Sequence, residues 1–367
     1  MTRRQLLPNL ALVLGSLLAG MALVEGGLRL AGYAPKRHRV RYRVSNRGDL
    51  RIRENASVLD CYEGNPRGYF VIDLRREETR RALAQRGFPD LTDVAREFPF
   101  AVEFAYNPQG FRDRPFGPKP AGVRRVAVVG DSFTEAQGVL EKDGYVRILE
   151  RLLSRPGSPP VEVRNLGYRG LDLPALLGSF EKALALDPDV IVYGMVLNDG
   201  DRSEAFDRKW PSLDDWIMVR RPPVEVGFFD SRLRALARDR LESASISRDT
   251  VAWYRGMYGE PNADGWNRTK LHLRTMKSKA RERGVGFIVA LWPLIVGTEG
   301  GYPFGEAHAR IRTVCERNGI PFLDLLDALR GRPSASLWVD PADMHPNEVG
   351  HRLAAEALAP RVAALLR

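Results

Sequence analysis

The 367-residue sequence contains only two cysteines, Cys61 and Cys315, far apart along the chain. Their separation does not match the closely spaced cysteine pairs of zinc sites. Cys315 lies among apolar residues at helical spacing, which favours a buried thiol, and a disulfide with Cys61 is the alternative outside the cytoplasm. Metal-ligand spacing of His, Cys and carboxylates is also missing, as is a glycine-rich phosphate loop. The sequence therefore predicts neither a metal nor another cofactor.

The sequence also lacks internal repeats, low-complexity tracts and segments in which basic and aromatic residues alternate. The formal net charge is +10, which favours anionic surfaces in general. However, lysine and arginine are spread over most of the chain, so we do not expect a nucleic-acid partner. With 44% hydrophobic and 28% charged residues, the composition is that of a folded globular protein.

A long apolar run occurs only at the N-terminus, where Arg3 and Arg4 precede 19 uncharged residues, Leu6–Val24. A helix needs roughly 20 apolar residues to cross a bilayer. No small-x-small cleavage pattern follows the run, so the sequence favours an uncleaved membrane anchor over a removed signal peptide. A buried helix of a soluble fold is the alternative.

From Arg124 onward, short strand-like runs alternate with segments whose apolar residues have helical spacing. The five predicted strands are RRVAVVG, VEVRNLG, DVIVYGMVL, GVGFIVALWP and IPFLDL. This alternation predicts a three-layer α/β/α fold with a five-stranded parallel sheet. We therefore expect an anchor in residues 1–30, a linker and N-terminal extension in 31–122, and a catalytic domain in 123–367.

The alternation weakens between residues 199 and 264, which we interpret as an insertion after the third strand. It would lie over the carboxyl edge of the sheet as a lid or a substrate platform. Its aromatic residues are of a kind that stacks on sugars or packs in a core: Trp210, Trp216, Trp253 and Tyr254.

Four candidate residues follow predicted strands or begin the last predicted helix. Ser132 follows the first strand, Gly170 the second and Asn198 the third, and His345 stands at the start of the last helix. Parallel sheets bind ligands beyond the carboxyl ends of their strands. We therefore expect these four residues at one edge of the sheet.

These residues resemble the four blocks of the SGNH, or GDSL-type, hydrolase family, which has a flavodoxin-like fold. The blocks are GDSF at Gly130–Phe133, Gly170 in NLGYRG, the Asn198–Asp199 pair, and His345. The resemblance runs from Arg124 to the end of the chain. The N-terminal anchor, followed by N-x-x-G-F-R at Asn107–Arg112, resembles membrane-anchored members of the family.

The sequence departs from the family pattern in two blocks. The third block has Val196 where a glycine is usual, and the nearest glycine is Gly194. The last block has Ala342 three residues before the histidine, where aspartate is usual. Similarity to polysaccharide-acetylating relatives with an Asp-x-His spacing favours Asp343 as the acid that orients His345, with Asp340 as the alternative.

The resemblance implies a serine esterase that acts on acyl, most simply acetyl, esters of a cell-envelope or extracellular glycan. Ser132 would be the nucleophile and His345 its base, and an acyl-serine would be the intermediate. The backbone N–H groups of Ser132 and Gly170 and the side chain of Asn198 would form the oxyanion hole. An acylated carbohydrate or a lipid ester would be the substrate.

Two other functions remain open. One is an O-acyltransferase of polysaccharide biosynthesis, which would need a membrane-bound acyl-donor partner. The other is a catalytically inactive module that binds glycan.

The resemblance also implies an extracytoplasmic, periplasmic catalytic domain. The positive-inside rule favours the opposite orientation, because six basic residues follow the apolar run: Arg29, Lys36, Arg37, Arg39, Arg41 and Arg43.

Overall fold

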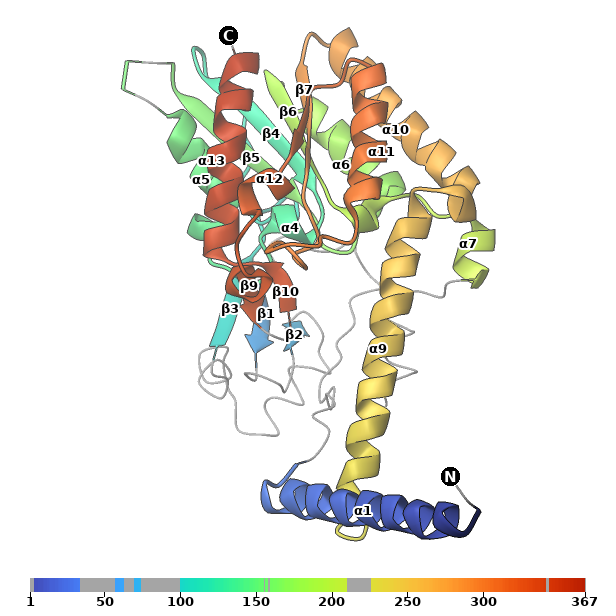
Figure 1. Ribbon diagram of the computed structural model, residues 1–367. Helices are drawn as coiled ribbons and strands as arrows, with labels where there is room; N and C mark the ends of the chain where they lie inside the picture. Colours follow the sequence, from blue (N-terminus) through green and yellow to red (C-terminus); the bar gives the residue numbers. More distant parts are fainter. Residues whose placement is uncertain are drawn as a thin grey trace. The chain divides into compact units, whose positions relative to one another are not determined.

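The computed structural model describes residues 3–33, 57–62, 69–73, 100–154, 156–157, 159–209, 226–340 and 343–366 (Figure 1). The chain divides into two compact units. The smaller unit is Met1–Arg39 with Pro211–Thr250, and the larger is Val40–Trp210 with Val251–Arg367. All candidate site residues belong to the larger unit.

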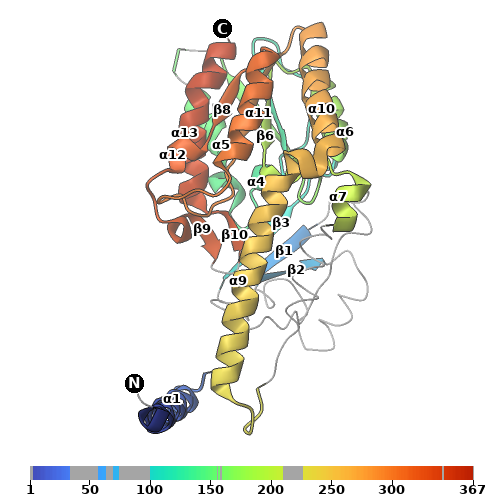
Figure 2. The same ribbon diagram turned by 45° about the vertical axis from the view of Figure 1, so that its right-hand side comes forward.

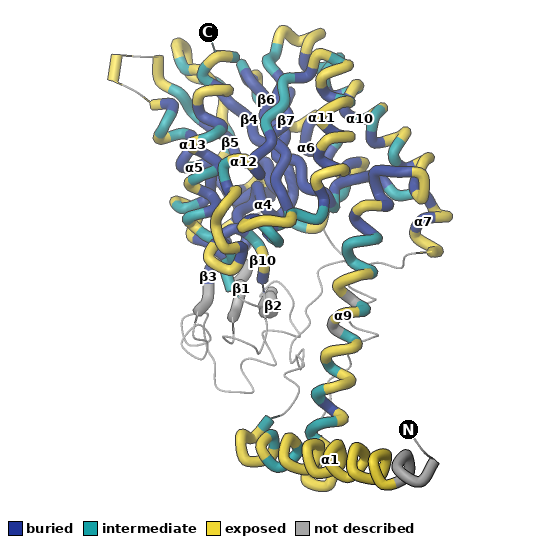
Figure 3. The backbone as a smooth tube through the Cα atoms, viewed as in Figure 1, coloured by how far each residue is buried: buried dark blue, intermediate teal, exposed yellow. Residues whose placement is uncertain are grey.

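A five-stranded parallel sheet forms the centre of the larger unit, with strand order β5-β4-β6-β7-β8. Its strands are β4 (Arg124–Gly130), β5 (Val161–Gly167), β6 (Val190–Met195), β7 (Gly286–Leu291) and β8 (Phe322–Asp324). Strands covered on both faces are rich in valine and isoleucine, as β4 and β6 are here. Figure 3 shows these strands buried along most of their length. The sheet and its flavodoxin-like order confirm the predicted fold.

Helices cover both faces of this sheet, which makes the three predicted layers (Figures 1 and 2). On one face lie α5 (Tyr145–Leu153), α12 (Leu326–Leu329) and α13 (Glu348–Leu365). On the other face lie α6 (Leu173–Leu184), α10 (Ala263–Glu282) and α11 (Gly305–Arg317). The main core packs between the sheet and the α5–α13 face, around residues such as Val128, Leu149, Val192, Trp292 and Leu358.

Several short elements follow or accompany the strands of the sheet. They are α4 (Ser132–Glu135), the 3-10 turns η2 (Glu141–Asp143), η3 (Leu197–Asp199) and η5 (Ser334–Leu337), and the antiparallel pair β9 (Trp338–Asp340) and β10 (Asp343–Pro346). Among them, α4, η3, β9 and β10 contain candidate residues. The insertion contributes α7 (Glu204–Lys209), α9 (Arg232–Met257) and η4 (Glu260–Asn262).

The N-terminal extension contains a second, antiparallel sheet that the sequence did not predict, with the order β2-β1-β3. Its strands are β1 (Ser57–Tyr62), β2 (Tyr69–Asp73) and β3 (Phe100–Ala105). Phe104 in β3 is buried and lies beneath the guanidinium groups of Arg112 and Arg169, 3.6 and 4.3 Å from its ring centre. Through Arg169, which follows β5, strand β3 therefore contacts the chain beside the central sheet.

The N-terminal helix α1 (Arg3–Leu30) belongs to the smaller unit. Its stretch Pro8–Leu30 has a mean hydropathy of 1.8, is long enough to cross a membrane, and has no buried residue. The core helix of a soluble protein would be mostly buried, so that alternative does not describe α1. A membrane anchor and a signal sequence both fit these properties.

Candidate active site

Glycines at or next to the ends of β4 and β6 allow α4, which begins at Ser132, to lie directly against the sheet. Gly130 and Gly194 are paired in register at the ends of β4 and β6. A Cβ at Gly130 would lie 2.1 Å from Thr134 Oγ1, and a Cβ at Gly194 would lie 2.4 Å from the Tyr145 hydroxyl. Since neither position has room for a side chain, α4 can sit directly on the sheet edge. Gly194, two residues earlier than the family pattern expects a glycine, therefore has a steric role.

The side chains of Ser132, His345 and Asp343 form a continuous hydrogen-bonded chain. His345 Nε2 lies 2.8 Å from Ser132 Oγ, and His345 Nδ1 is bonded to Asp343 Oδ1. With Asp343 ionised, Nδ1–H donates to the carboxylate and Nε2 is left to accept the serine proton. Asp343 is buried, whereas the His345 side chain is 23% exposed. This arrangement can activate a serine hydroxyl.

Because Asp343 and His345 both lie in strand β10, their Asp-x-His spacing brings the two side chains together. The sequence predicts His345 at the start of the last helix, but the structure places it in β10, before Asn347 caps α13 through the N–H groups of Val349 and Gly350. Residues two apart in a strand point to the same side, so Asp343 and His345 meet. Asp340 lies opposite Asp343 in the β9–β10 pairing, and the His345 Nδ1 bond goes to Asp343.

The surroundings of His345 set its protonation. Burial alone lowers the pKa of His345, but the charge of Asp343 and its hydrogen bond outweigh burial and raise that pKa above 6.5. The charge of Asp131 acts in the same direction. Phe133 packs against the imidazole, with ring centres 5.1 Å apart. His345 is therefore a stronger base than a free imidazole.

Asn198 is joined through Asp131 to the turn that carries Ser132. The Asn198 side-chain amide donates to Asp131 Oδ2 over 3.1 Å, and Asp131 Oδ1 accepts from the N–H of Phe133 at the start of α4. Asp199 is fully buried and accepts from the Tyr193 hydroxyl and the Val196 N–H at 2.7 and 3.0 Å. Burial and the charge of Asp131 raise the pKa of Asp199 well above its usual value. Asp199 thus fixes η3, which presents Asn198.

Gly170 follows β5 in a turn with a φ of +78°, a conformation that favours glycine. A Cβ there would meet no atom within 4 Å, so the requirement for glycine is conformational. The preceding residue, Arg169, donates from its backbone N–H and its Nε to Glu135 Oε2, at 3.1 and 2.6 Å. Glu135 is the last residue of α4, so the Gly170 turn is tied to the turn that carries Ser132.

The motif at Asn107–Arg112 has a structural role that sequence reasoning did not assign. Asn107 Oδ1 accepts from the N–H of Phe111 at 3.0 Å, which closes the turn. Arg112 is buried and donates to the carbonyl oxygens of Ala136 and Val139, at 2.7 and 2.8 Å. These carbonyls directly follow α4, and Ala136 has the positive φ of 63°. Arg112 therefore holds the segment that follows the Ser132 turn.

Gln137 is a second residue that the sequence did not single out. Its side-chain Nε2 donates to Asp343 Oδ2 over 3.2 Å and lies 3.2 Å from His345 Nδ1. Because Asp343 Oδ1 is bonded to His345, the Gln137 amide occupies the other carboxylate oxygen and orients the acid. Only its position five residues after Ser132 could have indicated this role.

The other histidines and insertion aromatics that the structure describes lie outside the Ser132–His345–Asp343 group. His351 is fully buried against Tyr145 and Trp292, and His308 bonds to Asp324 at 2.9 Å. Trp253 and Tyr254 are buried, so they pack rather than present a face to a sugar. His38, Trp210 and Trp216 lie outside the described residues.

Cys315 is a buried free thiol, as its helical spacing among apolar residues predicted. Burial raises the pKa of Cys315 to about 12. No group of three or more His, Cys, Asp or Glu within the described ranges could hold a metal ion.

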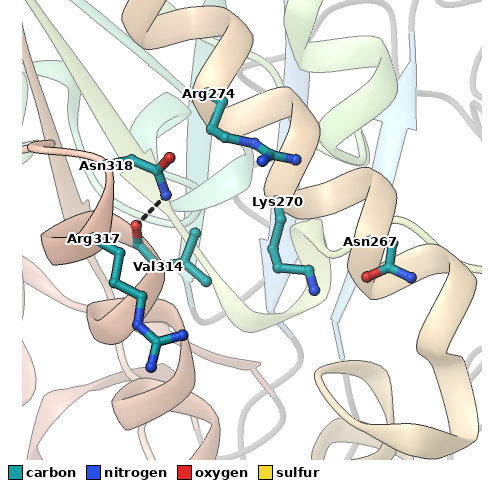
Figure 4. A pocket seen from close by; sticks show the side chains of 6 residues that line it. All are labelled: Asn267, Lys270, Arg274, Val314, Arg317 and Asn318. Atoms are coloured by element: carbon teal, nitrogen blue, oxygen red, sulfur yellow. Dashed lines mark hydrogen bonds between the residues drawn. The ribbon is translucent and has the colours of Figure 1, made fainter.

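A separate hollow of about 290 Å³ lies between α10 and α11 (Figure 4). It is lined by Asn267, Lys270, Arg274, Val314, Arg317 and Asn318. None of the candidate catalytic residues lines it, and we assign it no part in the active site.

Comparison with known proteins identifies the family. The model of the GDSL-like lipase/acylhydrolase family matches residues 128–353. The solved lipase/acylhydrolase from Enterococcus faecalis has 18% identity over 66% of this chain and 96% of its own, with a TM-score of 0.40. Axe2, an acetylxylan esterase from Geobacillus stearothermophilus, has 16% identity over 67% of this chain and 95% of its own, with a TM-score of 0.41. A comparison with curated proteins found no match. Because the family model covers more than half of the sequence, the chain belongs to the GDSL-like lipase/acylhydrolase family of hydrolases.

Proposed function

We propose that the chain is a serine esterase in which Ser132 is the nucleophile, His345 the general base and Asp343 the acid that orients it. The observation that carries this proposal is the 2.8 Å contact between His345 Nε2 and Ser132 Oγ, with Asp343 on the other ring nitrogen. An inactive glycan-binding module would not need this chain of contacts. The continuous series of contacts from Asp343 through His345 to Ser132 therefore favours catalysis.

The chemistry proceeds in two steps. Ser132 Oγ attacks the ester carbonyl carbon while His345 Nε2 takes its proton, and His345 then protonates the leaving sugar oxygen as its bond to the acyl carbon breaks. Water attacks the resulting acyl-Ser132 and gives a proton to His345. The proton returns to Ser132 Oγ as the carboxylic acid leaves. If a second sugar hydroxyl replaced water, the same site would transfer the acyl group.

Three donors would stabilise the oxyanion of each tetrahedral intermediate. They are the backbone N–H groups of Ser132 and Gly170 and the side-chain amide of Asn198. Support comes from the bonds that tie the last two to α4, through Asp131 and through Glu135. Removal of one such donor typically reduces the rate by about 10²–10³-fold.

We propose acetyl esters of a cell-envelope or extracellular glycan as the substrate. The apolar helix α1 and the net charge of +10 favour a place at an anionic envelope. Activity on acetylated oligosaccharides, compared with p-nitrophenyl esters of rising chain length, tests the choice. Preference for long acyl chains would contradict it. Acyl-sugar product formed only when an acceptor sugar is added would favour transfer.

The test of the nucleophile is Ser132→Ala, with Ser154→Ala as its matched control. Ser154 is exposed in the turn after α5. Loss of a catalytic serine typically lowers kcat on the order of 10⁶-fold, so we expect Ser132→Ala to lose measurable esterase activity and Ser154→Ala to keep it. Full activity of Ser132→Ala would refute the mechanism.

We further propose that residues 1–30 remain as an uncleaved anchor, with residues 31–122 as linker and extension and 123–367 as an extracytoplasmic catalytic domain. An alkaline phosphatase fusion after Arg367 should be active only when that end is exported. Activity of a cytoplasmic reporter at the same position would overturn the orientation. The intact mass of the membrane protein should include α1.

A further inference from the structure

The apolar run of α1 ends at Glu25, the first charged residue after Leu6–Val24. Nineteen helical residues at about 1.5 Å each span roughly 28 Å, close to the 30 Å hydrocarbon core of a bilayer. If α1 is the proposed anchor, Glu25 therefore lies at the boundary between the lipid tails and the headgroups.

Glu25 binds the beginning of α9, within the smaller unit. Its carboxylate accepts from the Ser231 hydroxyl at 3.0 Å and from the backbone N–H groups of Arg232 and Leu233 at 3.0 and 2.8 Å. The first N–H groups of a helix have no intrahelical acceptors. Usually a neighbouring residue supplies the cap, whereas here the acceptor comes from another helix, about 200 residues away in sequence.

Arg29, one turn further along α1, binds the chain just before α9. It is paired with Glu25 at 2.7 Å and donates to the carbonyl oxygens of Phe228 and Asp230 at 2.6 and 3.0 Å. Asp230 in turn closes the loop by accepting from the Gly227 N–H at 2.7 Å. Together Glu25 and Arg29, which we name the α1 clamp, hold the loop 227–231 against the last turns of α1.

This loop presents two aromatic side chains to the outside. Phe228 is 78% exposed and Phe229 is 95% exposed, with their rings in contact at 5.3 Å. Two adjacent phenylalanines with this exposure bury almost no apolar surface within the protein, and burying a phenylalanine side chain is worth about 1.5–3 kcal/mol. Transfer of the two rings from water to an apolar environment would therefore be favourable.

The α1 clamp fixes the position of the two rings along the axis of α1. The loop is bonded to Glu25 and Arg29, so it lies where the apolar run of α1 ends. The first turns of α9 add two exposed basic side chains, Arg234 and Arg240, which suit anionic lipid headgroups, whereas Arg238 between them pairs with Glu242. A second protein would explain the exposed rings equally well but not their position at the end of the apolar span.

We infer that Phe228 and Phe229 insert into the interfacial layer of the bilayer beside α1, as a second membrane contact. This inference rests on the proposed retention of α1 as an anchor. It also gives α1 a structural task after export, since cleavage before Glu25 would detach the apolar span from the capped end of α9. Lipid, rather than protein, is the partner of this surface.

The test uses the full chain in vesicles of phosphatidylethanolamine and phosphatidylglycerol. The photoreactive analogue p-benzoylphenylalanine replaces Phe229, Leu17 within the span, or Leu271, which is exposed on α10. Lipid adducts are then counted by mass spectrometry after illumination. We expect adducts at positions 229 and 17, and at least tenfold less at position 271.

Each other outcome decides between the claims. Adducts at position 17 alone would overturn the interfacial loop while leaving the anchor intact. Absence of adducts at both positions would overturn the anchor as well. Equal adducts at positions 229 and 271 would overturn a specific contact, as would crosslinks from position 229 to protein instead of lipid.

The clamp is tested in the protein that carries the analogue at position 229. Glu25→Ala should reduce the lipid adducts several-fold, because the loop loses its link to α1. The matched control is Glu204→Ala, an exposed carboxylate on α7 that is 93% accessible and pairs with Arg208. Unchanged adducts in Glu25→Ala, with the thermal unfolding transition preserved, would show that the clamp does not place the loop.

Discussion

The choice between Asp343 and Asp340 allows the sharpest prediction. Asp343→Asn removes the charge that holds His345 and keeps the shape of the side chain. An asparagine amide can donate to Nδ1, which leaves the proton on Nε2, the nitrogen that must accept from Ser132. In serine hydrolases with this arrangement, the equivalent change lowers kcat by about 10⁴-fold. We expect a loss of this size here.

The structure also predicts how the pH dependence changes. Burial lowers the pKa of His345, and Asp343 reverses that effect. Without the carboxylate, the pKa of His345 falls, so the acidic limb of the residual kcat/KM profile moves to lower pH. The assay is p-nitrophenyl acetate hydrolysis between pH 5 and pH 9, with active-site titration to correct for unfolded enzyme.

Asp340→Asn is the matched control for this experiment. Asp340 lies opposite Asp343 in the β9–β10 pairing, but the His345 bond goes to Asp343. We expect Asp340→Asn to change kcat by less than tenfold and to leave the acidic limb in place. If Asp340→Asn were the more damaging change, or if Asp343→Asn kept a tenth of the activity, the assignment of the acid would be wrong.

Other predictions concern protonation, the oxyanion hole and the sheet edge. The proposed mechanism needs neutral His345, and the pKa of His345 is raised. Wild-type kcat/KM should therefore decrease as the pH is lowered, with a midpoint above pH 6.5; a midpoint near 5 would contradict this. Asn198→Ala should lower kcat about 10²–10³-fold with little change in KM, and a pure KM effect would exclude its oxyanion role. Gly194→Ala should lower the free energy of unfolding, measured in urea, by about 1–3 kcal/mol, because the new Cβ would clash with the Tyr145 hydroxyl. The control Gly178→Ala, where a Cβ meets no atom within 4 Å, should not lower it. Burial lowers the pKa of His351 to about 3, so as the pH falls this histidine takes up a proton in the unfolded chain before it does so in the folded protein. The free energy of unfolding should therefore decrease below pH 6.5, by about 5 kcal/mol in full; a flat thermal midpoint down to pH 4 would contradict this.

The central sheet could be predicted because each of its strands is covered on both faces. Buried parallel strands need continuous apolar runs; β4 has the run Val126–Val129 after its two arginines, and β6 (VIVYGM) contains no charged residue. The family resemblance named Ser132, Asn198, Asp343 and His345, and the structure brings them to one edge. The sequence could not reveal that β10, rather than a helix start, holds His345.

The elements that the sequence missed lack such patterns. Helix α9 is 26 residues long and rich in arginine, without a clear apolar stripe, so periodicity gave no signal for it. Arg112 and Gln137 act through carbonyls and a carboxylate that come close only after Ala136 adopts a positive φ. No spacing along the chain encodes such contacts, because they depend on the turn that follows α4.

Labelling with a fluorophosphonate probe tests most directly whether His345 activates Ser132. The measurement is the mass of the peptide that contains Ser132, in the wild type and in His345→Ala. We expect a single phosphonyl adduct on Ser132 in the wild-type protein and at least a hundredfold slower labelling in His345→Ala. A folded wild-type protein that remains unlabelled at Ser132, or labelling that does not depend on His345, would contradict this expectation.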